Sequence, residues 1–181
     1  MIIDERDTRR ERVVDVAYAM MTAARTAPKG KGFDIIEVKL VTDNDISILS
    51  DAMLTYSEKT EMMFITRDAE NILHSDAIVL IGTRQKAHNL NCGYCGFATC
   101  ADKLKLPEVP CSLNSVDVGI ALGSACAAAA DARVDTRVMF SAGRVALDMG
   151  WMPNCSNVYA IPLSCSSKNP FFDRQSTRPK Q

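Results

Sequence analysis

The sequence predicts a single domain over residues 1–181 of the three-layer α/β/α or α+β class, with helices on both faces of a mixed sheet. Helical and strand patterns follow one another in the order α, β, α, α, β, α, α, β. One strand, 76–82, is continuously apolar, which is typical of a strand buried on both faces. A cysteine-rich segment over 89–112 interrupts this order and is predicted to be an inserted loop. With 47% hydrophobic residues, the chain can bury one sizeable core.

The N-terminal part is predicted to form a helix followed by a strand. Between Arg9 and Arg25, apolar residues recur at three- and four-residue steps, which predicts an amphipathic helix. A proline and two glycines within 27–32 end this helix. Residues 33–41 then alternate apolar and charged side chains, which is the pattern of a half-buried strand.

The middle of the chain is predicted to contain two helices before the buried strand. Residues 45–56 carry an apolar face and follow Asp43, which can cap a helix. The short apolar run 62–66 is predicted to be a strand or part of a loop, and 68–75 a helix. This second helix leads directly into the strand 76–82.

The clearest helical pattern follows the cysteine-rich segment. Residues 101–106 are predicted to form a helical turn, and 115–131 a long helix. Ser115 is its expected N-cap, which places Asp117 near the positive end of the helix dipole. Small residues lie four apart on one face of this helix: Gly119, Gly123 and Ala127. Because such a face lets another backbone approach closely, the helix is predicted to be central or at a subunit interface. An ordinary alanine-rich core helix explains the same pattern.

The C-terminal part is predicted to add a helix, a strand and a tail. Residues 135–149 have a helical pattern that Gly150 terminates, and 158–164 form the last strand. From Pro170 onward the chain is polar and basic, and its cations are expected to be solvated: Arg174, Arg178 and Lys180.

Composition and charge exclude several classes of function. The net charge of −1 gives no electrostatic basis for nucleic-acid binding. The N-terminus becomes charged at once and does not resemble a signal peptide, and the longest apolar run, 125–130, is too short to span a membrane. Seven unevenly spaced cysteines do not resemble a secreted disulfide framework. We therefore expect a cytoplasmic protein.

The strongest functional signal is the spacing of the cysteines. Cys92, Cys95 and Cys100 form the pattern C-x2-C-x4-C, and Cys111 follows after a short excursion. Two thiolates separated by two residues can face one metal, and four thiolates suit either an iron–sulfur cluster or tetrahedral zinc. The glycine, asparagine and threonine neighbours favour a ligand loop over buried cysteines.

The spacing favours iron over zinc. Zinc sites commonly use two C-x2-C pairs or a pair with histidines, whereas this segment has one pair and then isolated cysteines. His88, four residues before the first cysteine, is predicted to be a surface residue or a partner of the ligands. Cys126 and Cys165 are predicted to be buried, as is Cys155, although Cys155 is an alternative ligand.

A second candidate site is the turn after the first helix. Lys29, Gly30 and Lys31, with Arg25 before them, combine close backbone approach with positive charge, which suits a phosphate group. The turn lacks the strand–loop–helix setting of a P-loop. A solvated, flexible turn explains the same residues.

The cysteine segment resembles the small 4Fe-4S domain with the pattern C-x2-C-G-x3-C and a distant fourth cysteine. That resemblance implies that Cys92, Cys95, Cys100 and Cys111 are the ligands, with Gly96 beside the second. The whole chain also resembles a family of bacterial and archaeal proteins described only as containing a ferredoxin domain. The shared features are 24–32, the cysteine loop and 168–174.

Outside the loop, the layout is similar to the flavin-dependent nitroreductase fold. The segment 23–41 resembles that family's helix, flavin-binding loop and strand, although only Ala27-Pro28 of the loop pattern is retained. The stretch 117–150 resembles its two long central helices, which pack a homodimer with FMN at the interface. The resemblance implies FMN near Arg25 to Lys31 and a homodimer.

The sequence thus predicts an iron–sulfur redox protein, with a small oxidoreductase as the first hypothesis. A 4Fe-4S cluster would receive electrons from a ferredoxin-like donor protein and pass them to a flavin or a small-molecule substrate. The alternatives are a non-enzymatic electron-transfer module and a structural zinc protein. No catalytic acid or base can be selected, because the chain has two histidines and scattered carboxylates.

Overall fold

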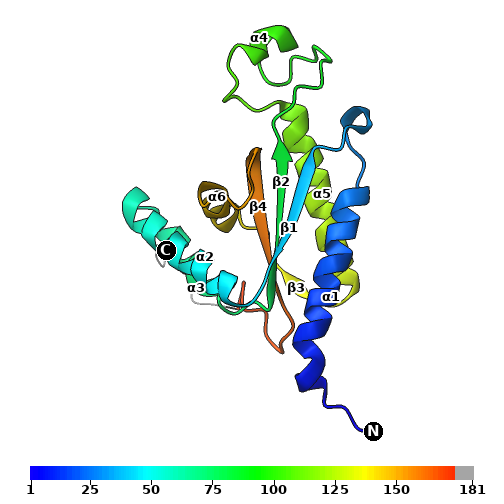
Figure 1. Ribbon diagram of the computed structural model, residues 1–181, viewed down its shortest axis with the longest axis vertical. Coiled ribbons are helices and arrows are strands. Elements are labelled where there is room, and N and C mark those ends of the chain that lie inside the picture. Colours follow the sequence, from blue (N-terminus) through cyan, green and yellow to red (C-terminus); the bar gives the residue numbers. More distant parts are fainter. Residues whose placement is uncertain (174–181) are drawn as a thin grey trace, which may run out of the picture.

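The computed structural model describes residues 1–173 and has three layers (Figure 1). Helices α1 and α5 cover one face of a central sheet, and α2, α3 and α6 cover the other. The predicted fold class, helices on both faces of a sheet, is confirmed. The helices are α1 (Glu5–Thr26), α2 (Asn44–Thr60), α3 (Met63–Ile72), α4 (Cys100–Leu104), α5 (Ser112–Asp131) and α6 (Phe140–Asp148), with a 3-10 turn η1 (Gly30–Gly32).

Within residues 1–173, the sheet has four strands in the order β1-β2-β4-β3. Every pairing among the strands of residues 1–173 is antiparallel, so the sheet described here is not the mixed sheet expected from the sequence. The central strands β2 and β4 pair over most of their length, from Ala77 opposite Leu163 to Thr83 opposite Asn157. The strands are β1 (Ile36–Val41), β2 (Ala77–Arg84), β3 (Asp135–Thr136) and β4 (Cys155–Ser164).

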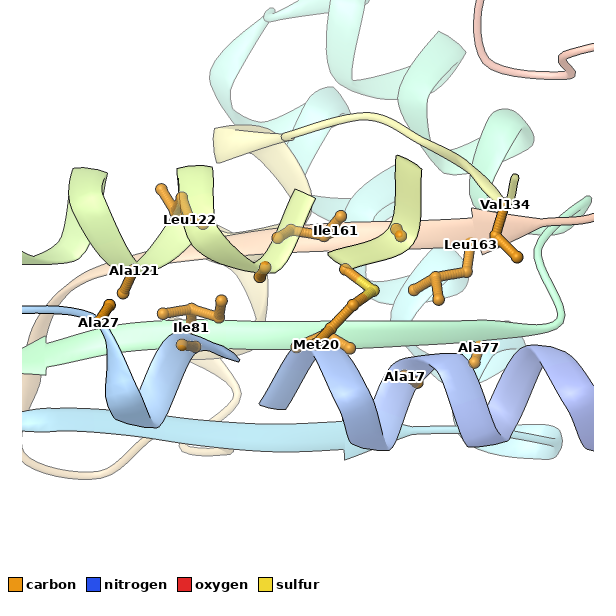
Figure 2. Close-up of a cluster of buried hydrophobic side chains, with 14 of the residues drawn as sticks. Ala17, Met20, Ala27, Ala77, Ile81, Ala121, Leu122, Val134, Ile161 and Leu163 are labelled. Carbon is orange, nitrogen blue, oxygen red and sulfur yellow. The ribbon is translucent and has the colours of Figure 1, made fainter. Parts of the chain in front are cut away.

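The continuously apolar strand β2 supplies both cores. Because successive side chains of a strand point to opposite faces, Ala77, Val79 and Ile81 enter the α1/α5 core. Ile78 and Leu80 enter the core under α2, α3 and α6. Figure 2 shows the first core, where side chains of α1 and α5 meet those of β2 and β4. The prediction that this strand is buried on both faces is confirmed.

Helix α3 replaces two predicted elements. The run 62–66, expected to be a strand or a loop, is helical from Met63 onward and continuous with the next predicted helix. Its buried face is formed by residues three and four apart: Ile65, Ala69 and Ile72. The exposed Met63 contributed to the apolar run without contributing to the core.

The predicted helix over 135–149 is in fact a strand followed by a shorter helix. Asp135 and Thr136 pair with the end of β4, and Met139 exchanges two backbone hydrogen bonds with Ala160 at 2.8 and 2.9 Å. Because these residues are extended against β4, helix α6 begins only at Phe140. The helix ends as expected before Gly150, which has a φ of +75°.

Helix α5 begins one turn earlier than predicted, at Ser112, with Cys111 rather than Ser115 at its N-cap. This shift moves Asp117 into the second turn, where its side chain is buried. By length and hydropathy, α5 could cross a membrane. Here it packs against α1 and β2.

Other boundaries also differ from the sequence prediction. Helix α1 begins at Glu5, because the Asp4 carboxylate accepts a hydrogen bond from the Arg6 backbone N–H at 2.9 Å. Strand β1 starts at Ile36, after the turn η1. Phe171 is completely buried, so the chain is still part of the fold at that point. The predicted tail cations Arg174, Arg178 and Lys180 lie outside the described residues.

Candidate functional site

The cysteine loop connects β2 to α5 and projects beyond the end of the sheet (Figure 1). Three of its thiols lie in the projecting part: Cys92 is exposed, and Cys95 and Cys100 are half-buried. Cys111 is buried at the N-cap of α5. The four predicted ligands therefore lie on one loop, with the fourth at its foot.

Local hydrogen bonds close the C-x2-C-x4-C segment into a compact turn. Gly93 and Gly96 have φ values of +73° and +87°, and the Gly96 N–H donates to the Gly93 carbonyl at 2.9 Å. The Asn91 side chain accepts the Cys100 N–H at 2.8 Å, and the Asn91 N–H points to the Cys100 Sγ at 3.3 Å. These hydrogen bonds therefore hold the two ends of the motif together.

The donor chemistry of this loop fits a metal or a cluster, although its side chains are not gathered around one point. All seven cysteines are free thiols. Among residues 1–173, no three His, Cys, Asp or Glu side chains lie close enough together to hold a metal ion. The ligand assignment therefore stays a prediction. Four thiols suit either iron–sulfur or zinc.

Two amide side chains hold the two ends of the cysteine loop together, where the chain leaves β2 and where it enters α5. Asn114 of α5 donates to the Lys86 carbonyl at 2.9 Å and accepts the Lys86 N–H at 3.1 Å. Gln85 donates to the carbonyls of Pro107 and Val109. These bonds join the chain leaving β2 to the chain entering α5, so they define where the projecting loop begins and ends.

We expect the substitution Asn114→Ala to destabilise the protein by about 1–3 kcal/mol, because Asn114 is fully buried and two polar backbone groups of Lys86 would lose their partners. Urea unfolding measures this change. Asn157→Ala is the matched control, since its amide bonds an exposed serine hydroxyl, and we expect a change below about 0.5 kcal/mol. Equal effects of the two substitutions would contradict this role of Asn114.

His88 is not the surface residue expected from the sequence, because 1% of it is exposed. Its ring stacks on Phe33, with ring centres 5.9 Å apart and planes at 10°. Its Nε2 lies 3.3 Å from the Asp117 Oδ2, which is within ion-pair distance but not aligned as a hydrogen bond. Asp117 is 3% exposed, and its Oδ1 accepts the Gly30 N–H at 2.9 Å. The His88–Asp117 pair therefore connects η1, the beginning of the cysteine loop and α5.

The predicted phosphate-binding residues lie in one region, but their polar groups already have internal partners. Lys29 donates to three carbonyls at the end of α1, and Arg25 donates to Asp34 at 2.7 Å and to the Ile36 carbonyl. Burial alone would raise the pKa of Asp34, but Arg25, together with Lys29 and the Ile36 N–H, outweighs it, and that pKa is lowered. The Lys31 ammonium donates to the His88 carbonyl. In this arrangement the turn does not fit a free phosphate-binding site.

A surface hollow of about 380 Å³ lies beside Arg25, between α1 and β1. Its lining is mostly apolar, with Tyr18 and Met21 from α1 and Val38 from β1. Arg25 also lines this hollow, whereas Lys29, Gly30 and Lys31 do not.

The cysteines outside the loop are in apolar surroundings. Burial raises the pKa of the Cys155 thiol to about 11, with a further contribution from Glu37. Burial also raises the pKa of Cys126. Cys126, Cys155 and Cys165 are partly buried rather than fully buried as expected, and each packs against one of the two hydrophobic cores.

The His88–Asp117 pair is the site feature that sequence reasoning missed. Gly30 and Asp117 are 87 positions apart, so their contact leaves no local pattern. The available signal was that Asp117 lies on the same face of the helix as Ala121 and Ala125, which indicates that its side chain points toward the core.

Solved structures establish the fold. The nitroreductase CinD from Lactococcus lactis, in complex with nicotinic acid, has a TM-score of 0.61 at 14% identity over 99% of this chain and 86% of its own. A BluB-like flavoprotein from Clostridium difficile 630 has a TM-score of 0.58 at 12% identity over 92% and 84%. A nitroreductase with bound FMN from Desulfitobacterium hafniense DCB-2 has a TM-score of 0.57 at 12% identity over 92% and 82%. The chain thus has the nitroreductase fold.

Sequence comparison establishes the family. An uncharacterized protein from Archaeoglobus fulgidus is 37% identical over 96% of this chain and 98% of its own length. Residues 108–174 match the family described as "uncharacterized protein containing a ferredoxin domain". That match includes Cys111 but begins after Cys92, Cys95 and Cys100. The chain belongs to this family of ferredoxin-domain proteins.

Proposed function

We propose that this protein is an iron–sulfur redox protein, and specifically a small oxidoreductase. In this proposal Cys92, Cys95, Cys100 and Cys111 hold a 4Fe-4S cluster, and electrons pass from it to a flavin or to a small-molecule substrate. One observation carries the proposal: one exposed and two half-buried thiols lie on one projecting loop, and a fourth, buried thiol lies where the loop enters α5, in a member of a ferredoxin-domain family. The nitroreductase fold supports a redox role.

The residues of the loop would have separate tasks. Cys92, Cys95 and Cys100 would supply thiolates, and Gly93 and Gly96 let the backbone turn tightly between them. The Asn91 N–H would stay near the Cys100 sulfur, where such a hydrogen bond favours negative charge. A bound 4Fe-4S cluster supplies one electron at a time.

We also propose FMN binding and a homodimer, which the nitroreductase resemblance implies. A phosphate at Arg25, Lys29, Gly30 and Lys31 would have to replace the internal contacts of that turn, so we derive no step through the flavin. Homodimer formation is supported by an exposed apolar face of α5 that includes Val116 and Ile120. Light scattering at twice the chain mass would support the homodimer, and a monomer mass would contradict it.

A second candidate function is electron transfer without catalysis. It is favoured by the exposed apolar side chains around the thiols, with Tyr94 77% exposed and Leu104 56% exposed. Such side chains suit a transient contact with a redox protein, for which a ferredoxin-like donor is our proposal.

A cytoplasmic location is also proposed. A structural zinc protein is the remaining alternative.

An absorption spectrum of protein purified without oxygen, before and after dithionite, tests these functions. We expect a broad visible band that bleaches on reduction, because thiolate–iron charge transfer is lost. Additional flavin peaks would support the oxidoreductase, and a bleaching band without flavin would support the electron-transfer module. A colourless sample would contradict both.

A further inference from the structure

We propose that a hollow between β1, the start of α2 and the turn after α6 binds a free α-amino acid with an apolar side chain. We call it the Trp151 hollow; its lining includes Lys39 and Val41 of β1, Asp45 of α2, Leu80 of β2, and Trp151. Its volume is about 350 Å³, which is within the range of small-molecule sites. The inference goes beyond the proposed redox function and does not depend on it.

The Trp151 hollow lies toward the end of the sheet opposite to the cysteine loop. Val41 pairs with Ile78 at the beginning of β2, whereas the cysteine loop leaves β2 at its end. Figure 1 shows the chain passing from β1 to α2 at the end of the sheet away from α4. The hollow is therefore separate from the predicted cluster ligands.

Two opposite charges line the Trp151 hollow without an ion-pair partner. Within residues 1–173, neither the Lys39 ammonium nor the Asp45 carboxylate forms an ion pair, either with each other or with another side chain. Both side chains are exposed. A ligand in the hollow can therefore reach one free cation and one free anion.

The neighbouring charges are already paired, which explains why these two are free. Glu37, two residues before the lysine on the same face of β1, forms an ion pair with Arg84 at 2.9 Å. Asp43, two residues before the aspartate, forms an ion pair with Arg10 of α1 at 2.6 Å. The unpaired charges of this region are thus confined to the hollow.

The rest of the lining is apolar and aromatic. Leu80 and Val41 belong to the core under α2, α3 and α6 and are 0% and 5% exposed, so the hollow extends down to that core. Trp151 packs against the same core and is half-buried. An apolar side chain placed here would be removed from water against the indole and the aliphatic groups.

A ligand that matches all three features carries a carboxylate, an ammonium and an apolar group. Its carboxylate would pair with the Lys39 Nζ and its ammonium with the Asp45 carboxylate, while its side chain packs on Trp151. An α-amino acid has these three groups on one carbon atom. Because Lys39 and Asp45 are exposed, each ion pair adds only about twofold to fivefold in affinity, and we expect millimolar binding.

The fluorescence of Trp151 tests this site, because it is the only tryptophan of the chain. L-phenylalanine is the probe, and it is compared with phenethylamine, which lacks the carboxylate, and with hydrocinnamate, which lacks the ammonium. We expect L-phenylalanine to change the fluorescence saturably and to bind about twofold to fivefold more tightly than either analogue. Calorimetric titration measures the same affinities without relying on the indole.

Two substitutions test the assigned contacts. In Lys39→Met, L-phenylalanine and phenethylamine should bind equally, and in Asp45→Asn, L-phenylalanine and hydrocinnamate should bind equally. The matched controls are Lys59→Met and Asp51→Asn, since both residues are exposed on α2 and do not line the hollow. These two variants should keep the preference of the wild-type protein.

Two results would overturn the amino-acid site. One is the absence of L-phenylalanine binding by both fluorescence and calorimetry, and the other is an unchanged preference in Lys39→Met and Asp45→Asn. Because the substituted side chains are exposed, we expect all variants to fold. Neither result would affect the redox proposal, which the absorption spectrum tests separately.

Discussion

Replacing Gly143 with alanine is expected to destabilise the protein by about 3 kcal/mol or more. Helix α6 packs directly on β4 at this glycine, and a Cβ would lie 2.3 Å from the Val158 carbonyl oxygen and 2.5 Å from the Tyr159 Cα. These are backbone atoms, so the strand or the whole helix must move. Urea unfolding followed by circular dichroism measures the loss.

The matched control is Gly119→Ala in α5. Gly119 also lies within a helix, but a Cβ there would meet nothing within 4 Å. At low protein concentration we expect it to stabilise the chain by up to about 1 kcal/mol, because alanine favours helix. If Gly143→Ala were as harmless as Gly119→Ala, the close packing of α6 on β4 would be wrong.

The second large effect concerns the metal ligands. Cys95→Ser is expected to remove most of the bound metal and to loosen the chain from Asn91 to Pro110, because a hydroxyl is a poor replacement for a thiolate ligand. Metal content per chain and limited proteolysis of the loop measure both effects. Cys126→Ala is the control, since that thiol packs against the core.

The two cysteine substitutions should differ clearly in their metal content. Cys126→Ala should retain the metal of the wild-type protein. Full metal content in Cys95→Ser would overturn the ligand assignment, whatever the identity of the metal.

The sequence predicted those elements whose signals are local. The strand β2 was evident because its apolar run, Ala77 to Ile81, serves two cores. The spacing of the cysteines was evident because it too is a local pattern of the sequence. In contrast, the extended conformation of Met139 depends on its pairing with Ala160, and this pairing is not visible in the local pattern. The helical pattern of 135–149 was therefore overridden at its start by tertiary contact.

In the candidate site, too, residues with a local sequence signal could be predicted and residues that depend on distant contacts could not. The thiols could be identified from spacing alone, whereas the roles of Asn114 and His88 depend on contacts with distant parts of the chain. The charged, glycine-rich Lys29 turn was predicted either to bind a phosphate or to be a solvated turn, and the choice between the two stays a prediction. In the fold, the ammonium of Lys29 is used to bond the carbonyls that end α1.

The central claim is that the cysteine loop holds an iron–sulfur cluster. Iron, acid-labile sulfide and zinc should be measured on one sample purified without oxygen. The proposal predicts about four iron and about four sulfide per chain, with little zinc. One zinc per chain without iron or sulfide would contradict it and would make the loop a structural metal site.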